Sequence, residues 1–139
     1  MKNKILPFFI IFILQLTGCS ENENMNKDIL TRVDVYKVNA DEKYDEEVII
    51  SDKSTVDILN QVFEQIVWEQ NVKAEMVRRE DIKAVLFMEV EENMPERLVK
   101  YDIWFERNGT ATIINRDENS LGKLDEKNAN ILKSKFNFE

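Results

Sequence analysis

Few side chains in this sequence have the chemistry to act as nucleophiles or transition-metal ligands. Cys19 is the only cysteine in the 139-residue chain, and there is no histidine. The usual ligands of zinc and copper are therefore missing, as are Ser-His and Cys-His nucleophilic pairs and the most common general base. The sequence predicts no cofactor and no transition-metal site, and a single cysteine excludes a disulfide within the chain.

Cys19 follows a segment typical of a secretory signal. Lys2 and Lys4 precede an apolar run at residues 5–14, which is about half as long as the roughly 20 residues that cross a bilayer. The four residues at the end of the segment resemble a bacterial lipobox: Leu16, Thr17, Gly18 and Cys19. The resemblance implies cleavage before Cys19 and a thioether-linked diacylglycerol on its sulfur. It also implies a protein anchored by lipid on the extracytoplasmic face of the cell membrane. An ordinary signal peptide and a short uncleaved anchor are the alternatives.

The chain is acidic, with 27 Asp and Glu against 19 Lys and Arg and a net charge of −8. Loss of Lys2 and Lys4 with the signal makes the mature protein more acidic still. Nucleic acid phosphates and anionic lipid headgroups repel such a surface. We therefore expect no nucleic-acid partner, and membrane attachment through the lipid on Cys19 alone. An envelope protein is the remaining candidate partner, although solubility by itself accounts for the charge.

The sequence divides into three parts: a signal peptide at residues 1–18, a lipidated cysteine with a polar tether at 19–28, and one domain at 29–139. Residues rich in β-formers predict strands at 29–38, 48–50, 83–91, 97–107 and 110–114. A three- and four-residue apolar spacing predicts a helix that begins at Ser54, with Asp57 completing a capping box. Asp125 caps a last helix at 126–136. The predicted fold is α+β: an antiparallel sheet of about five strands, an amphipathic helix on one face and a C-terminal helix.

The Asn108-Gly109 pair is the strongest short hairpin signal, and it predicts a two-residue type I′ turn. That turn places Trp104 opposite Ile113, on the sheet face that the first helix leaves uncovered. Four apolar residues on this face, rimmed by charges, form a candidate partner-binding patch: Val85, Phe87, Trp104 and Ile113. We expect Trp104→Ala to leave folding nearly intact. The alternative is that the C-terminal helix or the first strand covers the patch.

Two other kinds of site receive little support from the sequence. Clustered oxygens at residues 117–120 are of a type that binds calcium, but their spacing differs from an EF-hand loop. Paired carboxylates suffice for some hydrolases, yet 27 acidic residues make such pairs unavoidable. The sequence contains no Gly-rich phosphate loop and no GxSxG motif. It therefore predicts no enzyme and no catalytic residue.

The layout is similar to that of small single-domain lipoproteins of low-GC Gram-positive bacteria. The stretch from Ile50-Ser51-Asp52 to Tyr101-Asp102-Ile103-Trp104, together with the closing helix, resembles the YhfM-like domain. That resemblance implies an extracytoplasmic domain of unknown activity and assigns no functional residue. The sequence thus predicts a non-catalytic binding or accessory module. Its main rival is an acidic inhibitor or immunity-type protein that masks a basic envelope partner.

Overall fold

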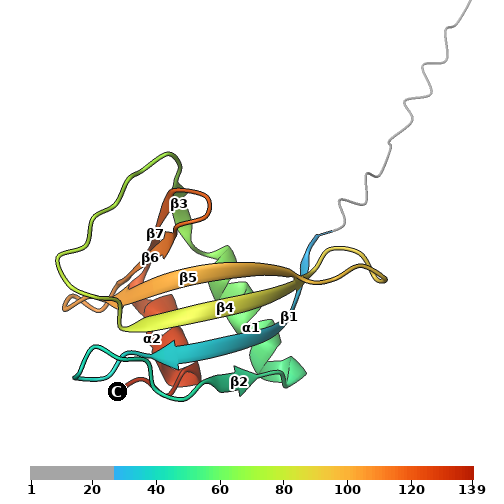
Figure 1. The fold of residues 1–139 in the computed structure, drawn as a ribbon, viewed down its shortest axis with the longest axis horizontal. Helices are drawn as coiled ribbons and strands as arrows, with labels where there is room; N and C mark the ends of the chain where they lie inside the picture. The colour runs from blue at the N-terminus through green and yellow to red at the C-terminus, as the bar shows by residue number, and fades with distance from the viewer. Residues whose placement is uncertain (1–26) are drawn as a thin grey trace, which may run out of the picture.

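A computed structural model describes residues 27–139 as one antiparallel sheet with two helices (Figure 1). The strands lie in the order β2-β1-β4-β5-β6-β7-β3. Their bounds are β1 (Ile29–Lys37), β2 (Val48–Ile50), β3 (Val67–Glu69), β4 (Ile82–Glu89), β5 (Arg97–Phe105), β6 (Ala111–Asn115) and β7 (Ser120–Leu124). The helices are α1 (Lys53–Glu64) and α2 (Glu126–Lys135). The α+β prediction is confirmed, but the sheet has seven strands and not about five.

The two unexpected strands, β3 and β7, pair with each other at one edge of the sheet. Residues 115–122 look like a polar loop, and β3 is only three residues long, so neither strand has a clear sequence signal. Gly122 in β7 lies opposite both Trp68 and Ile113. A Cβ there would lie 2.5 Å from Ile66 Cγ2, so the glycine permits a close approach that a larger residue prevents.

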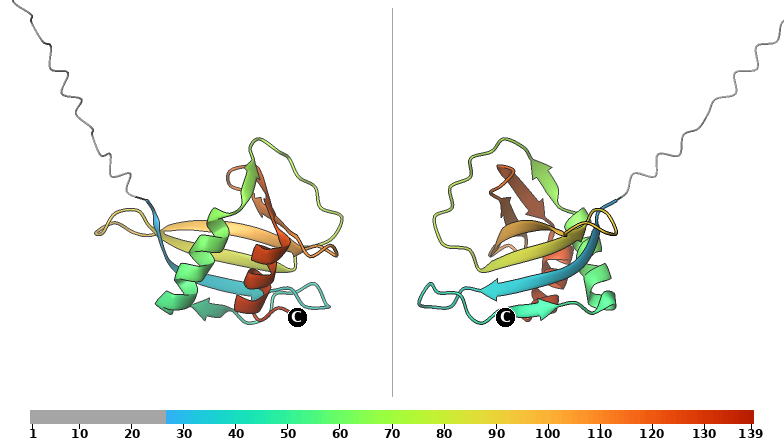
Figure 2. Two further views of the ribbon diagram at one scale, coloured as in Figure 1. Left: turned by 180° about the vertical axis from the view of Figure 1, so that it is seen from behind. Right: turned by 45° about the vertical axis from the view of Figure 1, so that its right-hand side comes forward.

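Both helices cover the same face of the sheet, as the view from behind shows (Figure 2). This face carries the predicted apolar side chains of β4 and β5, including Leu86, Ile103 and Phe105. The α1 residues Leu59 and Val62 pack into the same core. The helix side chains contribute the burial that short strands cannot supply alone, at about 25 cal/mol for each Å² of apolar surface. The predicted packing of the first helix is confirmed.

The two helices begin with aspartate caps. Asp52 accepts a hydrogen bond from Thr55 N at 3.0 Å, so α1 begins at Lys53. The capping box predicted for Ser54 and Asp57 is wrong, because Asp57 pairs with Lys53 instead. Asp125 accepts from Asn128 N at 2.8 Å and caps α2 as predicted. A carboxylate two residues earlier fits the cap better because it reaches the first free amides.

The hairpin between β5 and β6 differs from the predicted type I′ turn. Glu106 N donates to Thr110 O at 2.9 Å and Gly109 N donates to Glu106 O at 3.0 Å, which defines a three-residue loop. Of the Asn108-Gly109 pair, only Gly109 has a positive φ, +89°, whereas a type I′ turn needs two. The extra residue shifts the register by one, so Ile103 faces Ile113 and Trp104 faces Thr112. Ile113 therefore points to the helix-covered face.

Candidate functional site

The predicted partner-binding patch does not exist as an exposed surface. Trp104 and Ile113 retain only 1% and 0% exposure, and they lie on opposite faces of the sheet. Val85 and Phe87 are half-buried on the face away from the helices, and the Arg32 guanidinium lies 4.4 Å from the centre of the Phe87 ring. The prediction is wrong because the hairpin register moved Ile113 and because a loop covers Trp104.

That covering loop spans residues 70–81 between β3 and β4 (Figure 1). Its side chains Val72, Ala74 and Met76 are half-buried and alternate with exposed ones, although this segment forms no strand. Val72 N donates to Asn119 O at 3.0 Å, and the Trp104 Nε1 donates to Arg78 O at 3.0 Å. These bonds fasten the loop across the outer face, meaning the sheet face opposite the helices.

The far end of the loop is anchored to the sheet by Asp81. Its Oδ2 accepts from Phe105 N at 2.7 Å, and its Oδ1 lies 2.6 Å from Arg78 Nη1. Arg78 Nη2 also donates to Phe105 O at 3.0 Å. Arg79 and Glu80 lie between the two anchoring residues, Arg78 and Asp81. Because charge-assisted hydrogen bonds are the stronger kind, this anchor fixes where Arg79 and Glu80 meet the sheet.

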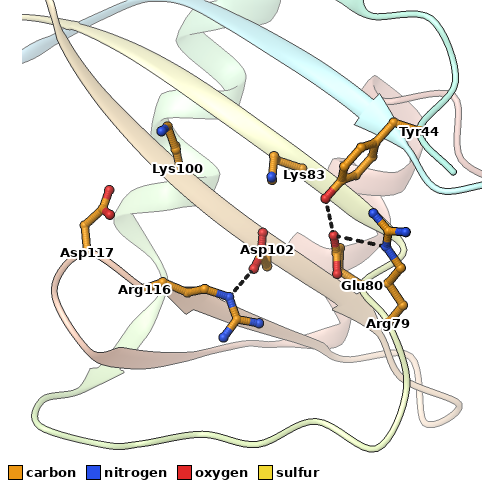
Figure 3. Close-up of a pocket in the computed structure, with 8 residues that line it drawn as sticks. All are labelled: Tyr44, Arg79, Glu80, Lys83, Lys100, Asp102, Arg116 and Asp117. Atoms are coloured by element: carbon orange, nitrogen blue, oxygen red, sulfur yellow. Dashed lines mark hydrogen bonds and ion pairs between the residues drawn. The ribbon is translucent and has the colours of Figure 1, made fainter. Parts of the chain in front are cut away.

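Beside the covering loop, the outer face contains a charged pocket of about 400 Å³ (Figure 3). Its walls come from the loop at residues 39–47, the covering loop, strands β4 and β5, and the β6–β7 turn. The lining residues are Tyr44, Arg79, Glu80, Lys83, Lys100, Asp102, Arg116 and Asp117. Four cations face three carboxylates, a positive balance in a chain whose net charge is −8. Such a cleft attracts anions that the rest of the surface repels.

Asp102 on β5 lies at the centre of the pocket floor and is almost fully buried. Its Oδ2 accepts from Arg116 Nε at 2.7 Å. Its other oxygen has no hydrogen-bond partner among residues 27–139, yet no side-chain oxygen in that range is both buried and unpaired. That oxygen is therefore open to solvent in the pocket. A carboxylate with one oxygen fixed and one free can take a proton from water.

Two lysines flank Asp102. Lys83 lies directly across from it on β4, and Lys100 precedes it by two residues on the same strand and face. Within the described part of the chain, neither ammonium group forms an ion pair with a carboxylate. Lys100 is therefore available to a ligand, whereas the Lys83 ammonium lies 4.9 Å from the centre of the Tyr44 ring.

The opposite wall of the pocket is a cluster of three side chains from two loops, Tyr44, Arg79 and Glu80 (Figure 3). The Tyr44 hydroxyl donates to Glu80 Oε1, and the Arg79 guanidinium lies 4.6 Å from the centre of the Tyr44 ring. Arg79 also donates to the backbone oxygen of Glu42. Burial raises the pKa of Glu80, but the hydrogen bond from Tyr44 and the nearby cations outweigh it, so that pKa lies below its usual value. Glu80 is therefore ionised at neutral pH.

The remaining predicted sites are the acidic segment at residues 117–120 and the lipobox. Asp117 lines the pocket, but the part of the chain from Lys27 onward contains no cluster of acidic, cysteine or histidine side chains arranged to hold a metal ion. Leu16, Thr17, Gly18 and Cys19 lie outside the described residues. Among residues 27–139, no helix has the length and hydrophobicity needed to span a membrane.

Comparison with known proteins yields one solved structure. It is the crystal structure of a thioesterase-like protein from Clostridium sporogenes, 23% identical, with a TM-score of 0.54. The match covers 79% of this chain and 98% of that protein. No family model matches the chain, and no curated protein is significantly similar to it.

The structural match corrects the predicted function. The similar structure is described as thioesterase-like, which counts against the predicted non-catalytic module, against its acidic-inhibitor rival and against the expectation of no enzyme. A likeness at this level of identity shows the fold alone. Any chemistry must be argued from the residues of this chain.

The sequence indicates the positions of two pocket residues, Lys100 and Asp102, but not the pocket itself. Lys100 and Asp102 alternate with the apolar Tyr101 and Ile103, which puts both charges on the uncovered face, but they appeared only as the rim of an apolar patch. Arg116 comes from a turn, and no local pattern links it to Asp102. The ion pair between them depends on the register of β5 and β6, which the predicted turn placed one residue out.

Proposed function

We propose that this domain has a hot-dog fold, in which an antiparallel sheet curls round a helix, and that it hydrolyses a thioester or ester in the outer-face pocket. The likeness to a thioesterase-like protein supports the reaction class. The observation on which the proposal depends is the Asp102 carboxylate, held by Arg116 at 2.7 Å with its second oxygen open to the pocket.

In this mechanism Asp102 acts as the general base. Its free oxygen takes a proton from a water molecule, and the water oxygen forms a bond to the acyl carbon of the substrate. Lys100, on the same face of β5, stabilises the negative charge that develops on the carbonyl oxygen. The bond to the leaving sulfur or oxygen then breaks, and the leaving group takes the proton back from Asp102. Arg116 is a positioning residue, because it acts on the carboxylate and not on the substrate.

Thiol release from a panel of acyl thioesters tests the proposal. Cys19 adds at most one thiol equivalent per chain to the signal, since it is the only cysteine. Asp102→Asn keeps the shape of the side chain and an oxygen for Arg116 but removes the base, so we expect a loss of about 10²- to 10⁴-fold in kcat. Lys100→Gln should also lower kcat while leaving KM largely unchanged.

Asp57→Asn is the matched control, because the Asp57 side chain is exposed on α1 and pairs, among residues 27–139, only with Lys53. It should keep wild-type activity. Thermal melting of each variant separates lost chemistry from lost folding. The proposal fails if no thioester or ester in the panel is hydrolysed, or if folded Asp102→Asn is as active as the wild-type protein.

We further propose, as a matter of location, that Cys19 carries a lipid that holds the domain on the outer face of the membrane. The sequence Leu16-Thr17-Gly18-Cys19 supports this, and two or more acyl chains suffice for stable anchoring. Mass spectrometry of the native protein should find Cys19 as a lipidated first residue. An unprocessed N-terminus, or a bare Cys19, contradicts the proposal.

A further inference from the structure

The Tyr44 ring, at the mouth of the pocket, contacts two of the four cations that line it. The Tyr44 ring lies 4.6 Å from the Arg79 guanidinium and 4.9 Å from the Lys83 ammonium, measured to the ring centre. Each contact is a cation–π interaction, in which the electron-rich ring face substitutes for an anion. The Tyr44 ring thus adds to the compensation of these positive charges by Glu80, whose Oε1 lies 3.6 Å from Arg79 Nε (Figure 3).

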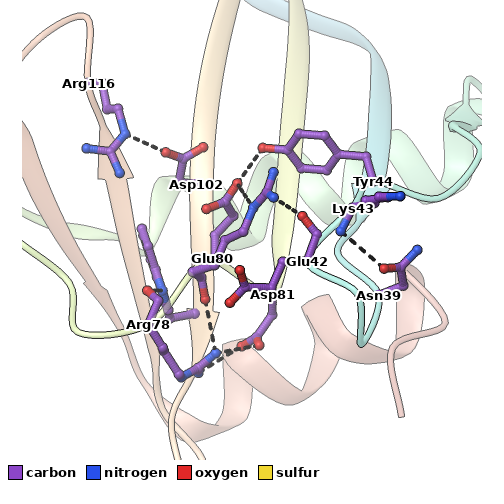
Figure 4. A network of polar contacts seen from close by, with 11 residues as sticks. Asn39, Glu42, Lys43, Tyr44, Arg78, Glu80, Asp81, Asp102 and Arg116 are labelled. Carbon is purple, nitrogen blue, oxygen red and sulfur yellow. Dashed lines mark hydrogen bonds and ion pairs between the residues drawn. The ribbon is translucent and has the colours of Figure 1, made fainter.

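The contact joins two loops that are distant in the sequence. Tyr44 belongs to the loop between β1 and β2, and Glu80 belongs to the covering loop (Figure 4). Arg79 precedes Glu80 in the same loop. Two hydrogen bonds reinforce it, from Tyr44 to Glu80 and from Arg79 to the Glu42 backbone. Tyr44 is nevertheless 38% exposed, so its ring can move aside without opening the core.

The cations beneath the Tyr44 ring favour a phosphate group over a singly charged carboxylate. Arg79 presents a planar fork of N–H donors and Lys83 presents three. The contacts of both with the Tyr44 ring are worth less than a charge-assisted hydrogen bond, but Arg79 also donates to the Glu42 backbone oxygen and pairs with Glu80 at 3.6 Å. Lys100 lies further along the sheet and remains available to the carbonyl oxygen of the proposed reaction. A phosphate group offers enough oxygens to engage both Arg79 and Lys83.

We propose that the pocket binds a phosphate group of a small soluble molecule at Arg79 and Lys83, and that the phosphate displaces the Tyr44 ring, which closes this subsite in the unliganded protein. This rests on the proposed function in using the same pocket, and it gives the substrate its class: a phosphorylated ester or thioester. Substrates without the phosphate should leave Tyr44 in place.

The direct test is ¹⁹F NMR of the full-length protein labelled with fluorotyrosine. The chain has three tyrosines, so Tyr44→Phe assigns the Tyr44 signal by its disappearance. Inorganic phosphate and glycerol phosphate should each shift the Tyr44 signal with a saturable, millimolar Kd, whereas acetate at equal ionic strength should not. Vesicles containing phosphatidic acid form a separate arm: a response to vesicles alone assigns the site to a lipid headgroup and overturns the soluble ligand.

Calorimetric titration with phosphate tests the displacement with two Tyr44 variants and the location of the subsite with two lysine variants. Tyr44→Leu removes the ring and should tighten binding about three- to tenfold, because the phosphate no longer competes for two cations. Tyr44→Phe keeps the ring and removes only the hydroxyl, so its affinity should stay within about twofold of wild type. Lys83→Gln should weaken binding at least fivefold, and Lys123→Gln, outside this pocket, should not.

Phosphate binding that leaves the Tyr44 signal unmoved overturns the inference. So does weaker phosphate binding by Tyr44→Leu than by the wild-type protein, or no phosphate binding by both. The test is separable from the proposed hydrolysis. A protein that hydrolyses thioesters while Tyr44 ignores phosphate keeps the proposed function and loses the phosphate subsite. A protein whose Tyr44 responds to phosphate but that cleaves nothing keeps the subsite and loses the hydrolase.

Discussion

The helix-covered face and the outer face of the sheet bury their side chains by different means. Two amphipathic helices cover the first, so its residues are apolar and its pattern is visible in the sequence. Loops and charged side chains cover the second: Trp104 lies under the loop at 70–81, and Asp102 is held by Arg116. The comparison teaches that full burial on this sheet does not require a helix, and that the polar chemistry collects where the helices are absent.

The largest expected effect tests whether the loop-covered part of the outer face is a true core. Trp104→Ala should lower the free energy of unfolding by about 3–5 kcal/mol, because it leaves a cavity and removes the hydrogen bond to Arg78 O. Urea unfolding followed by circular dichroism measures this. Leu98→Ala, at an exposed position of the same face, should cost less than about 0.5 kcal/mol. Equal costs for the two variants would show that the loop does not bury the indole.

Tyr101 on the helix-covered face should make the protein sensitive to alkali. Burial raises its pKa from 10.0 to about 12, because the folded protein disfavours the charged phenolate. Because this pKa is higher in the folded than in the unfolded protein, the contribution to stability is fully present below pH 10. About 2–3 kcal/mol of the free energy of unfolding should be lost as the pH rises from 10 toward 12. Urea unfolding at a series of alkaline pH values checks this. Tyr101→Phe should remove most of the dependence; an unchanged dependence would place its origin elsewhere.

Gly122 tests the edge where β3 closes over β7. A Cβ there would lie 2.5 Å from Ile66 Cγ2 and 2.9 Å from Trp68 Cζ3. Gly122→Ala should therefore destabilise the domain by about 1–3 kcal/mol through overpacking. Lys123→Ala, on the same strand and exposed, should stay within about 0.5 kcal/mol of wild type. A neutral Gly122→Ala would mean that β3 is not packed against β7 in solution.

The smallest expected effect concerns the turn that sets the register of the two faces. Gly109 has a φ of +89°, which costs a residue with a side chain about 1 kcal/mol. Gly109→Ala should lose that amount in urea unfolding, while Gly109→Asn, whose side chain tolerates this backbone region, should lose less. If alanine and asparagine prove equally costly, strain at this φ is not the cause.

Periodicity in the sequence predicted the helix-covered face well and the pocket hardly at all. The apolar spacing of α1 and the alternation along β4 and β5 are local consequences of burial on one side, so they can be recognised without knowing the fold. The pocket brings together Tyr44, Arg79, Asp102 and Arg116 from four separate segments. The strand order, the three-residue hairpin loop and the anchoring of the covering loop by Asp81 bring them together, and no local sequence pattern indicates any of these.

The strands at the two edges of the sheet, β2 and β3, are each only three residues long. Such short edge strands offer few unpaired backbone groups for a strand of a neighbouring molecule to pair with, although Ile49 and Val67 are exposed there. What keeps copies apart is then chiefly mutual repulsion among acidic surfaces, which vanishes near the isoelectric point of about 4.7. Concentrated samples should consequently stay clear at neutral pH and turn cloudy on mild acidification.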